Sequence, residues 1–343
     1  MSSVFLYIYF MKNWTFLVLL FIACSCQSVD KEVDLSVYYW KTQYELTPKE
    51  VAFLDENQVN KLYVRYCDVG LKNDQPIPIA PIEWKIKPLN TYEIVPVIYI
   101  KNEVFLKPHL DIEDLVRKLE LYIHQINTKA GIQTKHIQFD CDWSLDSKEQ
   151  FFEFLKQFKQ QTNTYLSATI RLHQIKYFEK TGIPPVDHGV LMYYNMGTIA
   201  ATQQNSIYDR SVAQKYVYSL TNYPMHLDIA LPVFSWGVHT RNGKVVNVIG
   251  GLRTNDFDTI PTIKRSDYTN YVVEEDYLYK GRLLLKDDVI KIEEVSSTAL
   301  EQATKDLSKY VNKKPKEIII YDLDSKNLES YEKEIFKIIR QGY

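Results

Sequence analysis

The stretch at residues 136–144, which reads HIQFDCDWS, decides how the rest of the chain is interpreted. It begins as an apolar strand and ends in two aspartates, Asp140 and Asp142, that are separated by one residue. Side chains two residues apart on a strand point to the same side, so these aspartates and Ser144 are expected to share one face. Two adjacent carboxylates repel each other and lose hydration on burial, so the pattern indicates a functional site.

The composition is that of a globular protein with a large core, with 45% hydrophobic and 24% charged residues. The net charge is −2 and the sequence has no long basic run, which argues against a nucleic-acid partner. The chain has 26 Tyr and 5 Trp, which favours a surface that stacks on ligands such as sugar rings. Cys67 and Cys141 lie on separate predicted strands and no Cys/His ligand cluster exists, so we expect no disulfide framework. We also expect no cofactor and no metal. A metal site of Asp140, Asp142 and His173 is the weaker alternative, because no HxH or HExxH spacing supports it.

The amino terminus has the pattern of a bacterial signal peptide. Residues 15–23 (TFLVLLFIA) form a short apolar run after Lys12, and FIAC at 21–24 resembles a lipobox, in which the cysteine is lipidated after cleavage. Cys24 is therefore the predicted lipidation site, and Cys26 is the alternative. The body of this lipoprotein would lie in the cell envelope, outside the cytoplasm, at the outer or inner membrane. An uncleaved membrane anchor over residues 4–23 is the other interpretation, although the run after Lys12 is too short to span a bilayer.

Eight apolar segments are predicted as strands, and most are followed by amphipathic helices. The strands are expected at 36–41, 61–69, 93–100, 136–144, 165–173, 189–195, 226–236 and 316–324. This alternation predicts a (β/α)8 TIM barrel in the α/β class. An open doubly wound sheet is the alternative, but the chain has no glycine-rich phosphate loop.

Several local patterns fix the boundaries of the elements. Thr47 and Glu50 form a capping box for one helix, and Asp146 with Glu149 predicts another for the helix that carries Phe151 in its buried stripe. A Pro-rich loop is expected at 75–81. Residues 237–312 are too long for a normal connection, so they are predicted as an insertion of hairpins followed by a helix. The chain thus divides into a leader (1–26), a polar tether (27–35) and a single barrel domain (36–343).

Polar side chains accumulate near the predicted carboxyl ends of the strands, where barrel active sites are built. They include Arg65, Asp68, Tyr99, Asp140, Asp142, Arg171, His173, Tyr194, Asn195, Asp228, Trp236, Asp322 and Asp324. Carboxylates, amides and aromatic rings around one mouth suit sugar chemistry. We predict Asp140 and Asp142 as catalytic residues. The predicted substrate-binding residues are Asp68, Arg171, His173, Tyr194, Asn195, Trp236 and Asp322. The alternative for the aspartates is a structural network with Arg171.

Two motifs resemble those of chitinase-type glycoside hydrolases of family eighteen. Residues 139–143 (FDCDW) resemble the signature of the fourth strand, which ends Asp-x-Asp-Trp-Glu, and residues 191–195 (LMYYN) resemble Met-x-Tyr-Asp of the sixth strand. The resemblance implies that Asp142 would orient the acetamido group of the substrate, with Tyr194 and Asn195 helping to hold it. The segments SATIRLHQIKY and LMYYNMG also resemble a family of lipoproteins from Bacteroidetes, which implies a location but no reaction.

The sequence departs from the family pattern at the position of the catalytic glutamate. Ser144 stands there, and a serine hydroxyl is not a general acid near neutral pH. Three hypotheses therefore stay open. The first is a cell-envelope glycoside hydrolase in which Asp68, Asp142 or Asp322 supplies the acid, and the second is a non-catalytic barrel that binds a polysaccharide or glycan. In both, the ligand is an extracellular or cell-wall glycan. The third is a structural or assembly lipoprotein that keeps a relic of the site.

Overall fold

The computed structural model describes residues 32–202 and 204–343, of which residues 33–343 form one compact unit. The predicted leader, the lipidation sites Cys24 and Cys26, and residues 27–31 of the tether lie outside the described residues. The last tether residues are in fact part of a strand, because the first strand begins at Asp34.

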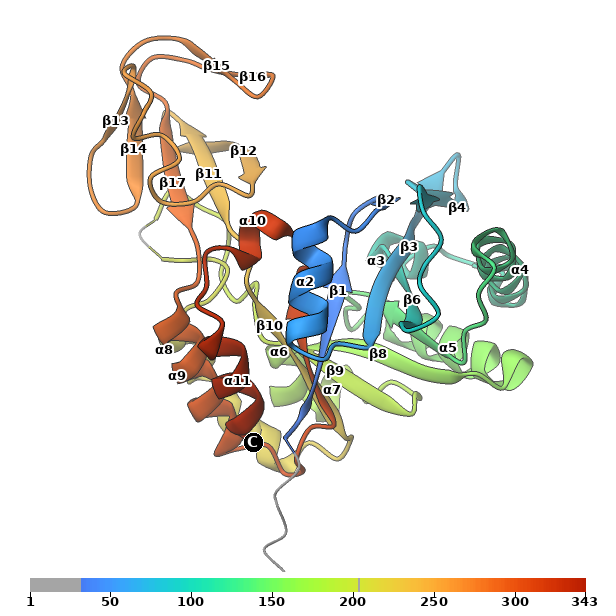
Figure 1. Ribbon diagram of the computed structural model, residues 1–343. Helices are drawn as coiled ribbons and strands as arrows, with labels where there is room; N and C mark the ends of the chain where they lie inside the picture. Colours follow the sequence, from blue (N-terminus) through green and yellow to red (C-terminus); the bar gives the residue numbers. More distant parts are fainter. Residues whose placement is uncertain (1–31, 203) are drawn as a thin grey trace, which may run out of the picture. The chain divides into compact units, whose positions relative to one another are not determined.

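Eight parallel strands form a closed barrel, as the sequence predicts. The first strand, β1, pairs with the last strand, β18, on one side and with β3 on the other, which closes the ring (Figure 1). The strands are β1 (Asp34–Tyr39), β3 (Lys61–Lys72), β6 (Glu93–Ile100), β7 (His136–Asp140), β8 (Tyr165–Arg171), β9 (His188–Met192), β10 (Leu227–Pro232) and β18 (Glu317–Tyr321). Their register places the carboxyl ends together, and these ends form the mouth of the barrel.

Helices connect the strands on the outside of the barrel. They are α2 (Pro48–Glu56), α3 (Asn102–Phe105), α4 (Ile112–Ala130), α5 (Lys148–Thr162), α6 (Leu172–Lys176), α7 (Phe178–Thr181), α8 (Arg210–Ala213), the 3-10 helix η1 (Val217–Asn222), α9 (Ser297–Ser308), α10 (Ser325–Leu328) and α11 (Glu334–Gln341). The predicted capping box of Thr47 and Glu50 is present at α2. The predicted capping box at Asp146 and Glu149 is wrong, because α5 begins at Lys148 after Ser147, which makes no side-chain cap bond.

Several strands end earlier than predicted. The strand expected at 136–144 ends at Asp140, the one expected at 165–173 ends at Arg171, and the one expected at 226–236 ends at Pro232. The polar residues after these positions belong to the loops and short helices of the mouth. The expected loop at 75–81 contains a strand, β4 (Gln75–Ile79), which pairs with the end of β3 as a hairpin.

The insertion between the seventh and eighth barrel strands is confirmed, and it forms an antiparallel sheet. This inserted sheet consists of β11 (Trp236–Arg241), β12 (Lys244–Gly250), β13 (Ile263–Arg265), β14 (Asn270–Val273) and β17 (Val289–Glu293) (Figure 1). A two-stranded hairpin, β15 (Tyr277–Tyr279) with β16 (Arg282–Leu284), extends from it. The sheet has a small core of its own that includes Leu252, Phe257 and Tyr271.

Candidate functional site

A cavity of about 450 Å³ opens at the mouth of the barrel. The residues that line it come from the carboxyl ends of seven of the barrel strands, all except β10, and from the loops that follow them. The side chains with chemical functions are Asp68, Asp140, Asp142, Arg65, Arg171, Thr169 and Asn195, and the rings are Tyr38, Trp40, Tyr99, Tyr194 and Tyr321. The volume is within the range of about 300–1,000 Å³ that is usual for ligand pockets.

Asp142 is held by Arg171 on the neighbouring barrel strand. The Nε of Arg171 donates to one carboxylate oxygen of Asp142, and Nη2 donates to the other at 2.8 Å. These two parallel bonds fix the orientation of both side chains, in addition to the attraction between their charges. Both oxygens of Asp142 are therefore occupied within the protein.

Asp68 is held in a similar way by Arg65, three residues earlier on β3. The Arg65 Nε donates to Asp68 Oδ1 at 2.8 Å, and Nη2 lies 2.7 Å from the same oxygen. The guanidinium is buried and its Nη1 also donates to the carbonyl of Ala80. Since Arg65 is fixed from two sides, Asp68 is fixed with it.

Asp140 is the most deeply placed carboxyl group of the mouth, with 5% of its surface exposed. It accepts a hydrogen bond of 2.6 Å from the hydroxyl of Thr169. Burial raises the pKa of Asp140 to about 6, and the negative charge of Asp142 adds to this shift, whereas the bond from Thr169 opposes it. Asp140 is therefore partly protonated at mildly acidic pH.

Aromatic rings form a continuous wall of the cavity. Tyr321 stacks on Tyr194 with ring centroids 5.0 Å apart, and it also contacts Trp40 (5.5 Å) and Tyr38 (5.6 Å). Burial raises the pKa of Tyr99 to about 12, so its hydroxyl stays protonated and remains a hydrogen-bond donor. Flat rings with hydroxyl groups at their edges suit the alternating C–H and O–H groups of a sugar.

Asn195 and His173 line a second, smaller cavity of about 100 Å³ beside the first. Asn195 borders both cavities, has a left-handed φ of 53°, and its amide oxygen has no hydrogen-bond partner among the described residues. The predicted strand position of His173 is wrong, because β8 ends at Arg171 and His173 is an exposed residue of α6. It consequently faces the smaller cavity instead of the barrel mouth.

Two predicted binding residues do not line either cavity in the described part of the chain. Trp236 begins the inserted sheet, and its indole N–H donates to Glu293 at 2.7 Å. Asp322 follows β18 and accepts a bond of 2.8 Å from Asn327, and burial raises its pKa to about 6. Both side chains instead link the barrel to neighbouring segments.

Ser144 also lies outside the cavity, contrary to the expected alternation of side chains. Because β7 ends at Asp140, the chain has left strand geometry before it reaches Ser144. Its backbone N–H donates to the hydroxyl of Ser147 at 2.9 Å, and its own hydroxyl accepts a bond of 3.4 Å from Asn102. Ser144, which stands where the family motif has a glutamate, thus contacts Asn102 and Ser147.

Asp228 was expected at the mouth but lies at the opposite end of the barrel. It is the second residue of β10, and its carboxylate accepts the backbone N–H groups of Lys316 (2.8 Å) and Glu317 (3.2 Å). The ring of His188 lies 3.3 Å from it, and burial lowers the pKa of His188 to about 4. Asp228 and His188 thus belong to a buried network at the base of the barrel. This network joins the beginnings of neighbouring strands, at the end opposite the mouth.

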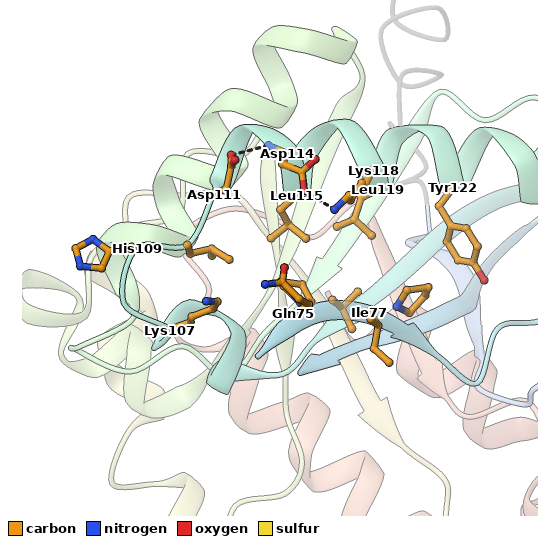
Figure 2. A pocket seen from close by; sticks show the side chains of 14 residues that line it. Gln75, Ile77, Lys107, His109, Asp111, Asp114, Leu115, Lys118, Leu119 and Tyr122 are labelled. Atoms are coloured by element: carbon orange, nitrogen blue, oxygen red, sulfur yellow. Dashed lines mark hydrogen bonds and ion pairs between the residues drawn. The ribbon is translucent and has the colours of Figure 1, made fainter. Parts of the chain in front are cut away.

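An apolar groove of about 310 Å³ lies outside the barrel between β4 and α4. Figure 2 shows Ile77 of β4 below Leu115 and Leu119 of α4. The charged groups around it are paired with each other, as in the contacts of Asp114 with Lys118 and of Lys107 with Asp74. The groove therefore offers a mainly apolar surface whose carboxylates and lysines are largely paired with one another.

The sequence interpretation missed several residues of the mouth cavity. Tyr38, Trp40, Thr169 and Tyr321 all line it, although none was selected as a site residue. One signal was available. Tyr38 and Trp40 are two residues apart at the end of the first strand, so their side chains are expected to point to the same side, and Tyr321 ends the last strand. Tyr99, Tyr194 and Trp236 were selected at other strand ends, but Tyr38, Trp40 and Tyr321 were not considered.

Among the described residues, no helix has the length and apolar character required to cross a membrane. Within the same residues, no group of three or more His, Cys, Asp or Glu side chains is arranged to hold a metal ion. Cys67 and Cys141 are both buried free thiols.

Comparison with solved structures identifies the fold of the barrel. The spore cortex-lytic enzyme SleL of Bacillus cereus superposes with a TM-score of 0.54 at 12% identity, covering 91% of this chain and 75% of SleL. A chitinase of Chromobacterium violaceum gives a TM-score of 0.50 at 10% identity, covering 90% of this chain and 98% of the chitinase. No protein-family model and no curated protein sequence matches the chain.

The chain has the barrel fold of chitinase-type glycoside hydrolases. The resemblance that was based on two short motifs is therefore confirmed for the fold. At this level of identity the likeness concerns the fold alone. The resemblance to lipoproteins of Bacteroidetes remains a prediction.

Proposed function

We propose that this protein binds a glycan in the mouth cavity and does not cleave it. The observation that carries the proposal is that every carboxyl group lining the cavity is already bonded within the protein. Asp68 is paired with Arg65, Asp142 is paired with Arg171 through both oxygens, and Asp140 is buried against Thr169.

Glycoside hydrolysis requires a carboxylic acid that reaches the glycosidic oxygen. Asp142 lines the cavity already paired with Arg171 through both of its oxygens. The serine at the position of the family glutamate is not an acid and does not line the cavity. The cavity therefore lacks an accessible proton donor of the usual kind, while its binding surface is intact.

The same features suit a carbohydrate ligand. Trp40 and Tyr321 are partly exposed at the cavity and offer ring surface to sugar C–H groups, while the buried rings of Tyr38 and Tyr194 support them from behind. The phenol of Tyr99 and the amide of Asn195 offer hydrogen bonds to hydroxyl or acetamido groups. The solved structures with this fold include a chitinase, which makes N-acetylglucosamine oligomers the first probes to use.

Hydrolysis is the second candidate, and one observation favours it. The pKa of Asp140 is raised to about 6, so this residue holds a proton at mildly acidic pH. Its hydrogen bond with Thr169 and its exposure of 5% place it at the floor of the cavity. A substrate would have to reach that depth for Asp140 to act as the acid.

The experiment measures binding and cleavage on the same ligands. Titration calorimetry with N-acetylglucosamine oligomers and soluble cell-wall polysaccharides is combined with detection of released reducing ends between pH 5 and 8. We expect binding without release, binding that survives Asp142→Asn, and weaker binding by Tyr321→Ala. Release of reducing ends by the parent that is lost in Asp140→Asn would overturn the proposal in favour of hydrolysis.

We also propose that the body is carried in the cell envelope by a lipid on Cys24 or, alternatively, Cys26. The lipobox-like segment at 21–24 and the short apolar run before it support this. Metabolic labelling with a radioactive fatty acid should label the parent and lose the label in the Cys24→Ala variant, or only after Cys26→Ala if the second cysteine is used. An unlabelled parent that remains in the membrane fraction would instead support the uncleaved anchor.

A further inference from the structure

The two cavities at the mouth are adjacent and share part of their lining. Arg171, Met192, Tyr194 and Asn195 line both of them. The smaller cavity continues outward to Tyr216, which precedes η1. The lining of the two cavities together therefore reaches from the barrel mouth to the side of α6 and η1.

Three tyrosine rings surround Lys176 at the end of this path. The ammonium of Lys176 lies 5.0 Å from the ring centroid of Tyr216, 5.5 Å from Tyr177 and 5.7 Å from Tyr218. It also donates to the backbone carbonyl of Lys215 at 3.0 Å. We name these residues, Lys176, Tyr177, Tyr216 and Tyr218, the tyrosine–lysine patch. The shared cation holds rings from two different elements in a fixed arrangement.

The patch presents large rings to solvent. Tyr177 is 48% exposed and Tyr218 is 51% exposed. Tyr216 is half-buried and belongs both to the patch and to the wall of the smaller cavity. Exposed rings that share a cation and adjoin a cavity through Tyr216 have the properties of a stacking platform.

We infer that the tyrosine–lysine patch is a second binding platform, on which the glycan held in the mouth cavity continues. The ligand is then a chain of several sugar units, longer than the cavity alone accommodates. Sugar C–H faces stack on Tyr177 and Tyr218, while Lys176 donates to hydroxyl or acetamido oxygens. This inference rests on the proposed glycan-binding function and specifies the length of the ligand.

The test compares a long and a short ligand. The probes are the hexamer and the dimer of N-acetylglucosamine, measured by calorimetry on the parent and on Tyr177→Ala/Tyr218→Ala. We expect the parent to bind the hexamer more tightly than the dimer. The double variant should lose about tenfold in affinity for the hexamer, as two stacking contacts imply, and keep its affinity for the dimer.

Two further variants make the comparison specific. Tyr177→Phe/Tyr218→Phe keeps the rings and should retain hexamer binding, which separates stacking from loss of the hydroxyl groups. Tyr268→Ala removes a tyrosine that is 80% exposed in the turn between β13 and β14, and it should leave the affinity for both oligomers unchanged. Thermal unfolding of each variant verifies that the fold is kept.

The outcomes separate the two proposals. Equal hexamer binding by the parent and the double alanine variant would overturn the second platform while leaving the proposed function intact. A parent that binds neither oligomer nor any polysaccharide of the panel would overturn the proposed function, and this inference with it. A loss of dimer and hexamer binding together would show that the rings support the cavity instead of extending it, and would also overturn the inference.

Discussion

At the scale of single residues, Asp140 combines burial with a titratable group. Its pKa of about 6 in the folded protein lies above the value of 3.8 for a free aspartate. Between about pH 4 and pH 6, Asp140 therefore holds a proton in the folded state that it has released in the unfolded state. The contribution of Asp140 to stability is greatest below about pH 4 and is lost as the pH rises through about 6.

Asp140→Asn should remove this dependence. Asparagine keeps an oxygen that can accept the bond from Thr169 but never ionises. The free energy of unfolding of the variant relative to the parent should increase between pH 4 and pH 6 and then level off, by about 3 kcal/mol at most. Urea unfolding at several pH values from 3.5 to 7.5 measures it. A stability difference that is independent of pH would contradict the assigned burial of the charge.

Ser144→Glu tests whether restoring the glutamate of the motif is sufficient to restore the mechanism of the family. We expect no cleavage of N-acetylglucosamine oligomers, because the side chain starts outside the cavity, beside Asn102 and Ser147. Arg171 would also still hold both oxygens of Asp142. The measurement is the release of reducing ends over a day at high enzyme concentration. Cleavage well above that of the parent would show that the loop after β7 can move Ser144 into the cavity.

The aspartate pair was visible in the sequence because charge at the end of an apolar strand is unusual. The position of Asp228 was misjudged for a related reason. It lies in an equally apolar segment, but near its beginning, and the beginning of a parallel strand is at the base of the barrel. Tyr38 and Tyr321 were missed because strands buried on both faces are apolar throughout, so the pattern does not tell the barrel interior from its exterior.

At the scale of elements, a buried lysine and a buried glutamate on β17 connect the inserted sheet to the loop after β9. Lys291 on β17 lies 2.6 Å from Glu293 and donates to the carbonyls of Ala200, Thr202 and Gln204 in the loop after β9. Glu293 in turn accepts the backbone N–H of Ser206 at 3.0 Å. One strand of the insertion thus organises the loop that follows Asn195.

Lys291→Met should destabilise the protein strongly. It leaves Glu293 as a buried charge without its partner, and three carbonyls lose their donor, for which a cost of about 3–5 kcal/mol is typical. Urea unfolding measures the loss, and limited proteolysis should detect faster cleavage in the loop after β9. Lys305→Met is the matched control, because its pair with Glu301 on α9 is exposed and should matter little. Equal effects of the two substitutions would contradict the structural role of Lys291.

Boundaries of elements were less predictable than their order. The eight strands and the insertion could be derived from hydrophobic pattern and length, whereas strand ends could not. Polar residues that follow a strand extend its alternating pattern by chance, as at His173, although the chain has already turned into α6. The strand at 75–79 was hidden by its prolines, which normally indicate a loop.

At the scale of the whole molecule, the two ends of the barrel differ in chemistry. The mouth carries carboxylates that are neutralised by arginines beside a wall of rings. The base is closed by buried histidines and acids, such as His136, whose pKa burial lowers to about 3, and Glu317, which accepts bonds from Lys61 and Tyr63. The proposed ligand site is at the mouth, so substitutions in this buried network at the base should affect stability and leave the proposed glycan affinity unchanged.

The hairpin of β3 and β4 has a consequence for how the protein behaves at high concentration. Within the described residues, β4 pairs with β3 only, so its other edge is open. Pro76 and Pro78 lie opposite Leu71 and Val69, and because proline has no N–H, the open edge lacks donors at these two positions. Another chain would find no regular ladder there, so the edge resists self-association.

Replacing both prolines, as in Pro76→Thr/Pro78→Val, should therefore promote aggregation without loss of the fold. Light scattering during prolonged incubation at high protein concentration would show it, with Pro81→Val, just outside the strand, as the control. If the double variant stays as soluble as the parent, another feature protects the edge. A protein that is crowded with its copies on a membrane surface would gain most from such protection, since its neighbours are always close.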